Sequence, residues 1–329
     1  MAAMTLTRRQ VLYASGATLA AAVSPRLAAA QSYPARPVRI IVPFAAGGPN
    51  DLVARLIAQG LSDRLGKQFY VENIGGAGGN VGTGQASRAA PDGYTILMVA
   101  PSFAANPTLF DSVPYDPHKS FDAVTVAATA PTVLTVHPSV PATTVTELIG
   151  AIKATPGKYS YASPGTGTPP HLLGELFRLS LQLDVVHVPF SSGGLALGST
   201  VAGHTPISFG ALPPAVPHIK EGKLRALAVT SNTPSAALAD VPSIAQAGYP
   251  DIAGDIWTAV LVPAGTPKDI TELLQGEIAR LIALPDVKDR MASMGFQPVG
   301  NTPDECAVHI KAEASKWAKV IRDAGIKVR

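Results

Sequence analysis

A short glycine turn between an apolar run and a helical pattern is the first stretch whose residue types suggest chemistry. The run Val38–Val42 ends at Pro43, and Gly47 and Gly48 precede a predicted helix whose apolar stripe starts at Val53. Glycine adopts positive φ and lets a ligand approach the backbone, while the first N–H groups of a helix lack intrahelical partners. Because a helix start carries roughly +0.5 of an elementary charge, the turn predicts an anion site that needs no lysine or arginine. The alternative is a tight strand–helix connection that binds nothing.

The same arrangement recurs in the middle of the chain. A predicted strand over Tyr159–Ser163 leads into a turn with Gly165 and Gly167, and the turn opens a helix over His171–Leu181. Because both turns combine glycines with a helix start, we predict a second half-site that faces the first. Hydroxyl groups are added to this second turn by Ser163, Thr166 and Thr168.

Asp51 lies at the start of the first predicted helix. A carboxylate in that place is stabilised by the helix dipole by roughly 0.3–1 kcal/mol, without any ligand. It could equally accept a hydrogen bond from a ligand amine or a bridging water. The sequence leaves these two interpretations open.

Signatures of several enzyme and metal-site classes fail at identifiable positions. Gly76–Val81 breaks the dinucleotide-binding fingerprint at its last position, and Gly60–Lys67 is one residue too long for a phosphate loop. His171 and Glu175 share one predicted helix face, but the missing second histidine or cysteine pair favours a local polar contact over a metal site. Cys306 falls on an apolar helix stripe and is expected to be a buried, unreactive thiol. We expect no cofactor and no metal.

The first 30 residues have the charged, apolar and small-residue order of an export signal. Arg8 and Arg9 precede the apolar run Val11–Val23, and Ala28–Ala30 predicts cleavage after residue 30. The order around the arginine pair resembles a twin-arginine signal, although a general secretory signal also fits. The apolar run is shorter than the ~20 residues of a membrane helix. We therefore expect a soluble protein of the bacterial periplasm.

Composition and charge argue against nucleic acid as a partner. The signal holds three arginines and no acidic residue, so its removal takes the formal net charge from +3 to zero. Nucleic-acid binding depends on clustered lysine and arginine, which a neutral mature chain does not favour. At 329 residues and 47% hydrophobic content, the chain can fold into two domains with a large core. Its single cysteine permits no intramolecular disulfide.

Strand and helix patterns alternate along the chain, which is typical of an α/β fold with mostly parallel sheets. In such sheets ligands bind at the carboxyl ends of the strands, where Pro43, the glycine loop Gly75–Gly79 and Ser102 fall. A long predicted strand over Asp255–Val262 leads back to the first unit, and two final helices complete it. We therefore predict one lobe from residues 31–131 and 255–329, an inserted lobe from residues 132–254, and two crossing strands as the hinge.

A series of motifs runs through the mature chain in a fixed order. They are Tyr33–Pro34, Pro37–Phe44, Gly47–Gly48 with Asp51 and Ala54–Arg55, Val71–Asn73 with Gly76–Asn80, Ala90–Tyr94, Pro114–Pro117, Tyr161–Ser163 with Gly165 and Gly167, His171–Leu172 with Gly174–Phe177, and Gly222–Ala228. Together they resemble the periplasmic solute receptors of tripartite tricarboxylate transporters, also called Bug receptors. The resemblance covers essentially all of the mature chain.

This resemblance implies a two-lobed type II periplasmic binding protein that closes on a small organic carboxylate. It implies a monomeric receptor, not an enzyme, that delivers the ligand to membrane permease subunits. Ligand contacts are then made largely by backbone groups and bridging waters of the two glycine turns. The candidate ligand-binding residues carried over are Phe44, Ala46, Gly47 and Asp51 on one lobe, Ser163, Gly165, Thr166, Gly167 and Thr168 on the other, and also Ser102 and Ala211.

Two departures from the family pattern lie in the predicted second lobe. Where relatives often have Val-Pro-Tyr-Lys-Gly, this chain has Val188–Gly193 without a lysine, and where they often have Val-Asp it has Thr205–Pro206. The acid stays open among dicarboxylates, tricarboxylates, amino acids and aromatic acids. Two other functions also stay open: a hydrolase-like cleft enzyme that uses Ser163 or His171, and a ligand sensor that engages a signalling protein.

Overall fold

The computed structural model describes residues 33–327 of the chain. From Arg36 onward the described residues belong to one compact unit. The predicted export signal and its cleavage after Ala30 lie outside the described residues. None of the helices within 33–327 has the length and apolarity of a membrane-spanning segment.

The first half of the fold is built on three parallel strands, with β1 (Val38–Val42) between β2 (Phe69–Asn73) and β3 (Thr95–Val99). All five residues of β3 are buried, as are four of β1, which explains why both strands appear as apolar runs. The antiparallel strand β9 (Asp255–Pro263) follows β3. The other elements of this half are α2 (Pro49–Leu65), η2 (Ala77–Gly79), α3 (Asn80–Ser87), α4 (Ser102–Leu109), α9 (Lys268–Ile282), α10 (Pro285–Ser293) and β10 (Gln297–Pro298).

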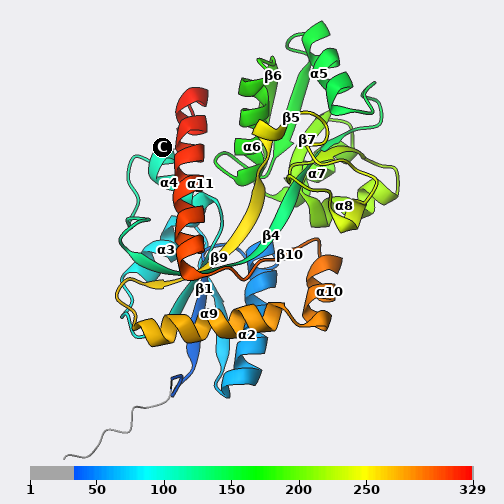
Figure 1. The fold of residues 1–329 in the computed structure, drawn as a ribbon. Helices are drawn as coiled ribbons and strands as arrows, with labels where there is room; N and C mark the ends of the chain where they lie inside the picture. Colours follow the sequence, from blue (N-terminus) through cyan, green and yellow to red (C-terminus); the bar gives the residue numbers. More distant parts are fainter. Residues whose placement is uncertain (1–32, 328–329) are drawn as a thin grey trace, which may run out of the picture. The chain divides into compact units, whose positions relative to one another are not determined.

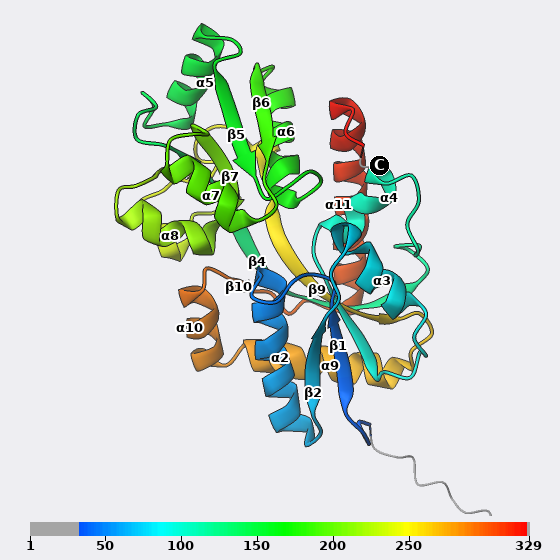
Figure 2. The same ribbon diagram turned by 180° about the vertical axis from the view of Figure 1, so that it is seen from behind.

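The second half repeats the pattern, with β5 (Tyr159–Ser163) parallel to both β6 (Val185–Pro189) and β7 (Ile207–Ala211). Figures 1 and 2 show the two sets of elements, with β1, α2 and α9 in one and β5, α5 and α8 in the other. The predicted α/β fold with mostly parallel sheets is confirmed. The other elements of this half are α5 (Val145–Ala154), α6 (Pro169–Ser180), α7 (Gly193–Val201), α8 (Leu212–Lys220), β8 (Arg225–Val229), η3 (Ala236–Leu238) and η4 (Pro250–Ile252).

One long strand, β4 (Phe121–Val136), belongs to both halves. Its first part pairs antiparallel with β9 as far as Pro131, which lies opposite Asp255. From Thr132 onward it pairs with β7 and also with β8. The change of partner therefore falls between two consecutive residues of β4.

Four helices were not predicted from the sequence. They are α4, which begins at Ser102, and α7, α8 and α10. α4 and α8 each contain a proline, Pro107 and Pro217, and three of the four helices have nine residues while α4 has eight. In short helices, and in those that contain proline, the periodic spacing of apolar residues is weak. Their formation depends mainly on tertiary packing.

The C-terminal helix α11 (Pro303–Ala324) contacts the cores of both halves. A capping box begins this helix: Thr302 Oγ1 accepts from the N–H of Glu305, whose carboxylate accepts from the N–H of Thr302. Cys306 packs in the cluster around Trp257, whereas Trp317 packs in the cluster of the second half. Cys306 is buried, as predicted, and burial raises the pKa of its thiol to about 12.

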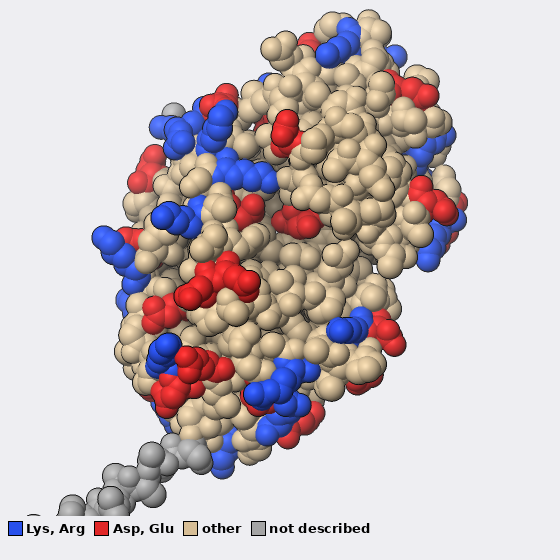
Figure 3. Space-filling view, viewed as in Figure 1, with Lys and Arg blue, Asp and Glu red and all other residues tan. Residues whose placement is uncertain are grey.

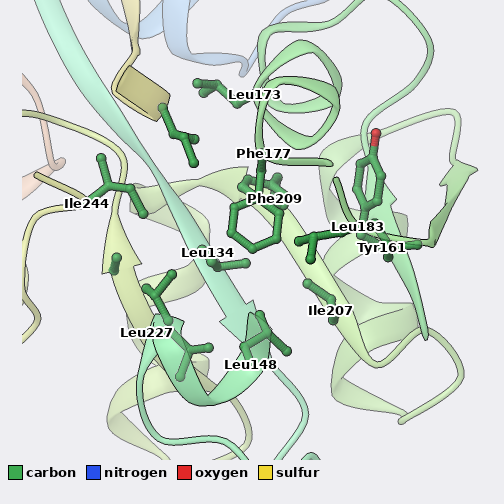
Figure 4. Packing of buried hydrophobic residues seen from close by; sticks show 14 of the residues in the cluster. Leu134, Leu148, Tyr161, Leu173, Phe177, Leu183, Ile207, Phe209, Leu227 and Ile244 are labelled. Atoms are coloured by element: carbon green, nitrogen blue, oxygen red, sulfur yellow. The ribbon is translucent and has the colours of Figure 1, made fainter. Parts of the chain in front are cut away.

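The core of the second half surrounds β4, β5 and β7 (Figure 4). Phe177 from α6 lies beside Phe209 from β7, with ring centroids 5.6 Å apart, and Tyr161 approaches Phe209 edge-on at 5.6 Å. Aromatic pairs at such separations add to the stabilisation from area burial. This packing holds α6, the helix that follows the second glycine turn, against the sheet.

Candidate functional site

The first glycine turn connects the end of β1 to the start of α2. Gly47 has φ of +82°, a conformation that favours glycine, and Pro49 occupies the first helical position, where a missing N–H costs nothing. Ala45, Ala46 and Gly47 are exposed, so this backbone is open to a ligand.

Asp51 holds this turn from the inside. Its carboxylate accepts from the N–H of Gly47 at 2.8 Å, from Arg55 Nε at 2.9 Å and from Asn73 Nδ2 at 2.9 Å. Burial raises the pKa of Asp51, but the hydrogen bonds from Arg55, Gly47 and Asn73 outweigh it, and the pKa lies below its usual value. With the side chain 3% exposed and its oxygens engaged by the chain's own donors, Asp51 acts here as a positioning residue.

Two further segments lie beside the first turn. Gly79, which has positive φ, packs so closely on the ring of Phe44 that an added Cβ would lie 3.3 Å from it. Gly78 faces the ring of Phe110 in the same way at 3.4 Å, and its carbonyl accepts from Asn106 Nδ2 at 3.0 Å. Sequence reasoning missed Asn106 and Phe110, because only the fold brings them to the glycine loop.

The second glycine turn connects the end of β5 to the start of α6. Gly165 and Gly167 have φ of +132° and +81°. Thr168 Oγ1 donates to the carbonyl of Gly165 at 2.7 Å, and the N–H of Gly165 donates to Ser163 Oγ at 3.3 Å. The hydroxyls of Ser163 and Thr168 thus shape the turn, while Thr166 is exposed.

The structure brings the second turn against the first half of the fold. A Cβ added to Gly167 would lie 2.2 Å from Cδ2 of Leu109, at the end of α4, so only glycine fits there without movement. Strand register places the remaining candidates at the same sheet edges. Ser102 lies beyond the end of β3, next to β1, and Ala211 ends β7, next to β5.

Behind the second turn lies a row of buried polar side chains. Ser163 Oγ and His187 Nε2 are 2.7 Å apart, and His171 Nδ1 accepts from the N–H of Gly167 at 3.0 Å. Glu175 accepts from Tyr161 Oη at 2.7 Å and from Arg178 at 2.7 Å. The carboxylate that could have joined His171 in a metal site is therefore engaged elsewhere. Among residues 33–327 no cluster of three histidine, cysteine or acidic side chains could hold a metal ion.

Charges are distributed without a dominant sign on the surface shown in Figure 3. Basic and acidic side chains lie interspersed, and no broad basic patch covers that face. This agrees with the neutral mature chain deduced from composition. Long-range attraction of a polyanion would need a single-sign field, which this face does not provide.

Comparison with known proteins gives a consistent match. The family model "Tripartite tricarboxylate transporter family receptor" matches residues 53–326. Protein BugT of Bordetella pertussis is 35% identical over 320 residues, which cover 97% of both chains. Among solved structures, an R. palustris protein with adipate has a TM-score of 0.81 at 32% identity and covers 90% of this chain and all of its own. MatC of Rhodopseudomonas palustris with bound malate has a TM-score of 0.76 at 31% identity, with coverages of 88% and 100%.

Proposed function

The chain belongs to the tripartite tricarboxylate transporter receptor family, whose members are periplasmic solute-binding receptors and not enzymes, and from this premise we propose its ligand and partner. The ligand is a small organic carboxylate, captured between the two glycine turns. The partner is the membrane permease of a tripartite tricarboxylate-type transporter, which receives the ligand from the closed receptor. Relatives solved with adipate and with malate support the carboxylate class.

The observation that carries this proposal is the repeated turn at the starts of α2 and α6. Each turn has a positive-φ glycine and a proline at the first helical position, and each is held from behind by a side chain four residues further on. The start of each helix carries partial positive charge, which favours an anion nearby. The proposed site therefore needs no buried lysine or arginine to hold the carboxylate.

The binding residues and lobes of the proposal follow the same division. Residues 31–131 and 255–329 form the first lobe and supply Phe44, Ala46 and Gly47, with Asp51 behind them. Residues 132–254 form the second lobe and supply Ser163, Gly165, Thr166, Gly167 and Thr168. The crossing strands β4 and β9 act as the hinge, because β4 changes partner from β9 to β7 opposite Asp255. Ser102 and Ala211 contact the ligand from the neighbouring strand ends.

The receptor acts as a monomer after its export signal is removed behind Ala30, by the twin-arginine or the general secretory route. Its energetics are ordinary for such a site. A micromolar dissociation constant corresponds to about −8.2 kcal/mol. Several hydrogen bonds to a charged group, at roughly 1.5–3 kcal/mol each, supply that free energy after the cost of ordering both partners.

Replacing Gly47 with valine is expected to abolish carboxylate binding and to leave the fold intact. An added Cβ at Gly47 meets no atom within 4 Å, so the core is not disturbed. A β-branched residue cannot adopt φ of +82° without strain. The backbone of the turn is therefore expected to shift, and its N–H groups no longer point toward the ligand. Thermal-shift measurements against aliphatic and aromatic mono-, di- and tricarboxylates check this result.

Gly222→Val is the matched control. Gly222 has φ of +70°, an added Cβ there also meets nothing within 4 Å, and it lies in the exposed turn before β8. The control should retain every shift that the parent protein shows, because a ligand that binds the folded state raises the melting temperature. If the Gly47 variant folds and binds as well as the Gly222 variant, the first turn is not part of the site.

A further inference from the structure

We propose that His171 is the positioning residue of the second glycine turn, in the role that Asp51 has in the first. This inference rests on the proposed function, because it assigns how the second half-site is built. Asp51 and His171 are both the third residue of their helix, α2 and α6. Each accepts the N–H of the glycine four residues earlier, Gly47 at 2.8 Å and Gly167 at 3.0 Å. The N–H groups of these two glycines are therefore not available to a ligand, and in the second turn the N–H of Thr168 is also engaged, with the carbonyl of Gly165 at 3.3 Å.

The contact between His171 and Gly167 is enclosed on both sides. The side chain of His171 is 3% exposed, and Gly167 is buried between it and Leu109. A buried backbone N–H that loses its acceptor costs free energy, so the imidazole and the turn stabilise each other. Because Nδ1 accepts, the proton of the neutral ring lies on Nε2.

His187 extends this support to the other glycine of the turn. Its ring lies on that of His171, with centroids 4.0 Å apart, and on that of Tyr161 at 4.9 Å. His187 Nε2 pairs with Ser163 Oγ at 2.7 Å, and Ser163 Oγ accepts from the N–H of Gly165. One imidazole thus holds Gly167 directly, and the other holds Gly165 through a serine.

Both imidazoles must be neutral for this arrangement to hold. Burial lowers the pKa of His171 to about 4, helped by His187, and burial likewise lowers the pKa of His187 to about 4. Glu175 raises both pKa values without reversing the effect of burial, and Arg178 lowers that of His171 further. The other groups that face the pair, Tyr161 and Ser163, are neutral. A protonated His171 would point an N–H at the N–H of Gly167 and displace the turn.

The proposal predicts a specific tautomer, which can be measured without any ligand. In protein labelled with ¹⁵N-histidine, His171 should show a protonated Nε2 and an accepting Nδ1, unchanged from pH 8 down to pH 5. Gly167, labelled separately, should show an amide signal that moves in the His171→Asn and His171→Leu variants. A His171 that carries its proton on Nδ1, or that becomes charged near pH 6.5, overturns the proposal.

A ligand-binding experiment compares two variants of His171, both of which remove the imidazole ring that stacks on His187. His171→Asn places an amide oxygen where Nδ1 lay and retains an acceptor for Gly167, whereas His171→Leu fills the space without one. With adipate as the probe in calorimetry, the leucine variant should bind about tenfold more weakly than the asparagine variant. Equal affinities in two folded variants would show that the Nδ1 acceptor does not position the turn.

The two experiments distinguish the positioning role of His171 from the proposal that the ligand is a carboxylate. If the parent protein binds neither adipate nor any other carboxylate, the proposed ligand class fails, while the tautomer measurement still decides the role of His171. If the parent protein binds and the tautomer is wrong, the positioning role fails and the receptor proposal stands.

Discussion

Replacement of Glu313 by leucine is expected to lower the free energy of unfolding by about 2–6 kcal/mol. Glu313 Oε2 accepts from Trp257 Nε1 at 2.9 Å and from Trp317 Nε1 at 2.8 Å. Both tryptophans are at most 1% exposed, so their N–H groups would find no water. A buried donor without an acceptor costs roughly 1–3 kcal/mol, and leucine leaves two of them. Because Trp257 lies on β9 and Trp317 on α11, one oxygen ties a crossing strand to the helix that contacts both cores.

Glu313→Gln is the control for this prediction. Its amide oxygen can accept from both indoles, so most of the stability should return. Denaturant unfolding followed by tryptophan fluorescence measures both variants and reports on the two residues at once. A leucine variant as stable as the glutamine variant would mean that the shared oxygen does not hold β9 to α11.

Replacement of Asp255 by asparagine is expected to stabilise the protein at pH 8 and to make little difference at pH 4. Asp255 begins β9, and its Oδ1 is enclosed without a hydrogen-bond partner in the described part of the chain. The pKa of Asp255 is raised from 3.8 to about 6, chiefly by burial, which the charge of Lys316 offsets only in part and the charge of Glu313 reinforces. Asparagine mimics the protonated acid and removes the buried negative charge.

The direction of the pH dependence of stability follows from proton binding to Asp255. The folded state holds the proton of Asp255 more tightly than the unfolded chain, so the contribution of this group is fully present below pH 4 and is lost as the pH rises through 6. A difference of about two pKa units corresponds to roughly 3 kcal/mol, which is the upper limit of the gain at pH 8. Free energies of unfolding measured between pH 4 and pH 8 should therefore decline less steeply in the variant.

Asp251→Asn provides the matched comparison. Asp251 lies four residues earlier, lines the same small pocket as Lys316, and is exposed. Its replacement should leave the pH dependence of stability unchanged, because an exposed carboxylate loses little hydration on folding. If Asp255→Asn follows the parent protein at every pH, the carboxylate is not buried as the structure has it.

The glycine turns could be predicted from the sequence because their signals are local. The buried runs that became β1 and β5 stop at proline and glycine, and helix patterns resume within a few residues. The α/β class follows from that alternation, since one local signal repeats along the chain. The prediction of a carboxylate site needed no side chain that only the fold brings near.

The partners of the turns could not be predicted, because they come from distant parts of the chain. His187 meets Ser163 across two strands, and Glu313 meets Trp257 from a helix 56 residues later. The alternation of inward and outward side chains in β6 does not identify His187 as the partner of a serine. For Asp51 the sequence left two interpretations, and the hydrogen bonds from Gly47, Arg55 and Asn73 favour the positioning role.

The central claim is that one carboxylate is held between the two turns and leaves unchanged. The most direct test is calorimetric titration of the mature protein, expressed from Gln31, with adipate, malate and the carboxylate that gives the largest thermal shift, followed by analysis of the recovered ligand. We predict saturable binding of one molecule per chain, loss of that binding in Gly47→Val, and recovery of the acid intact. Absence of binding for every carboxylate, or recovery of a converted product, would contradict the account.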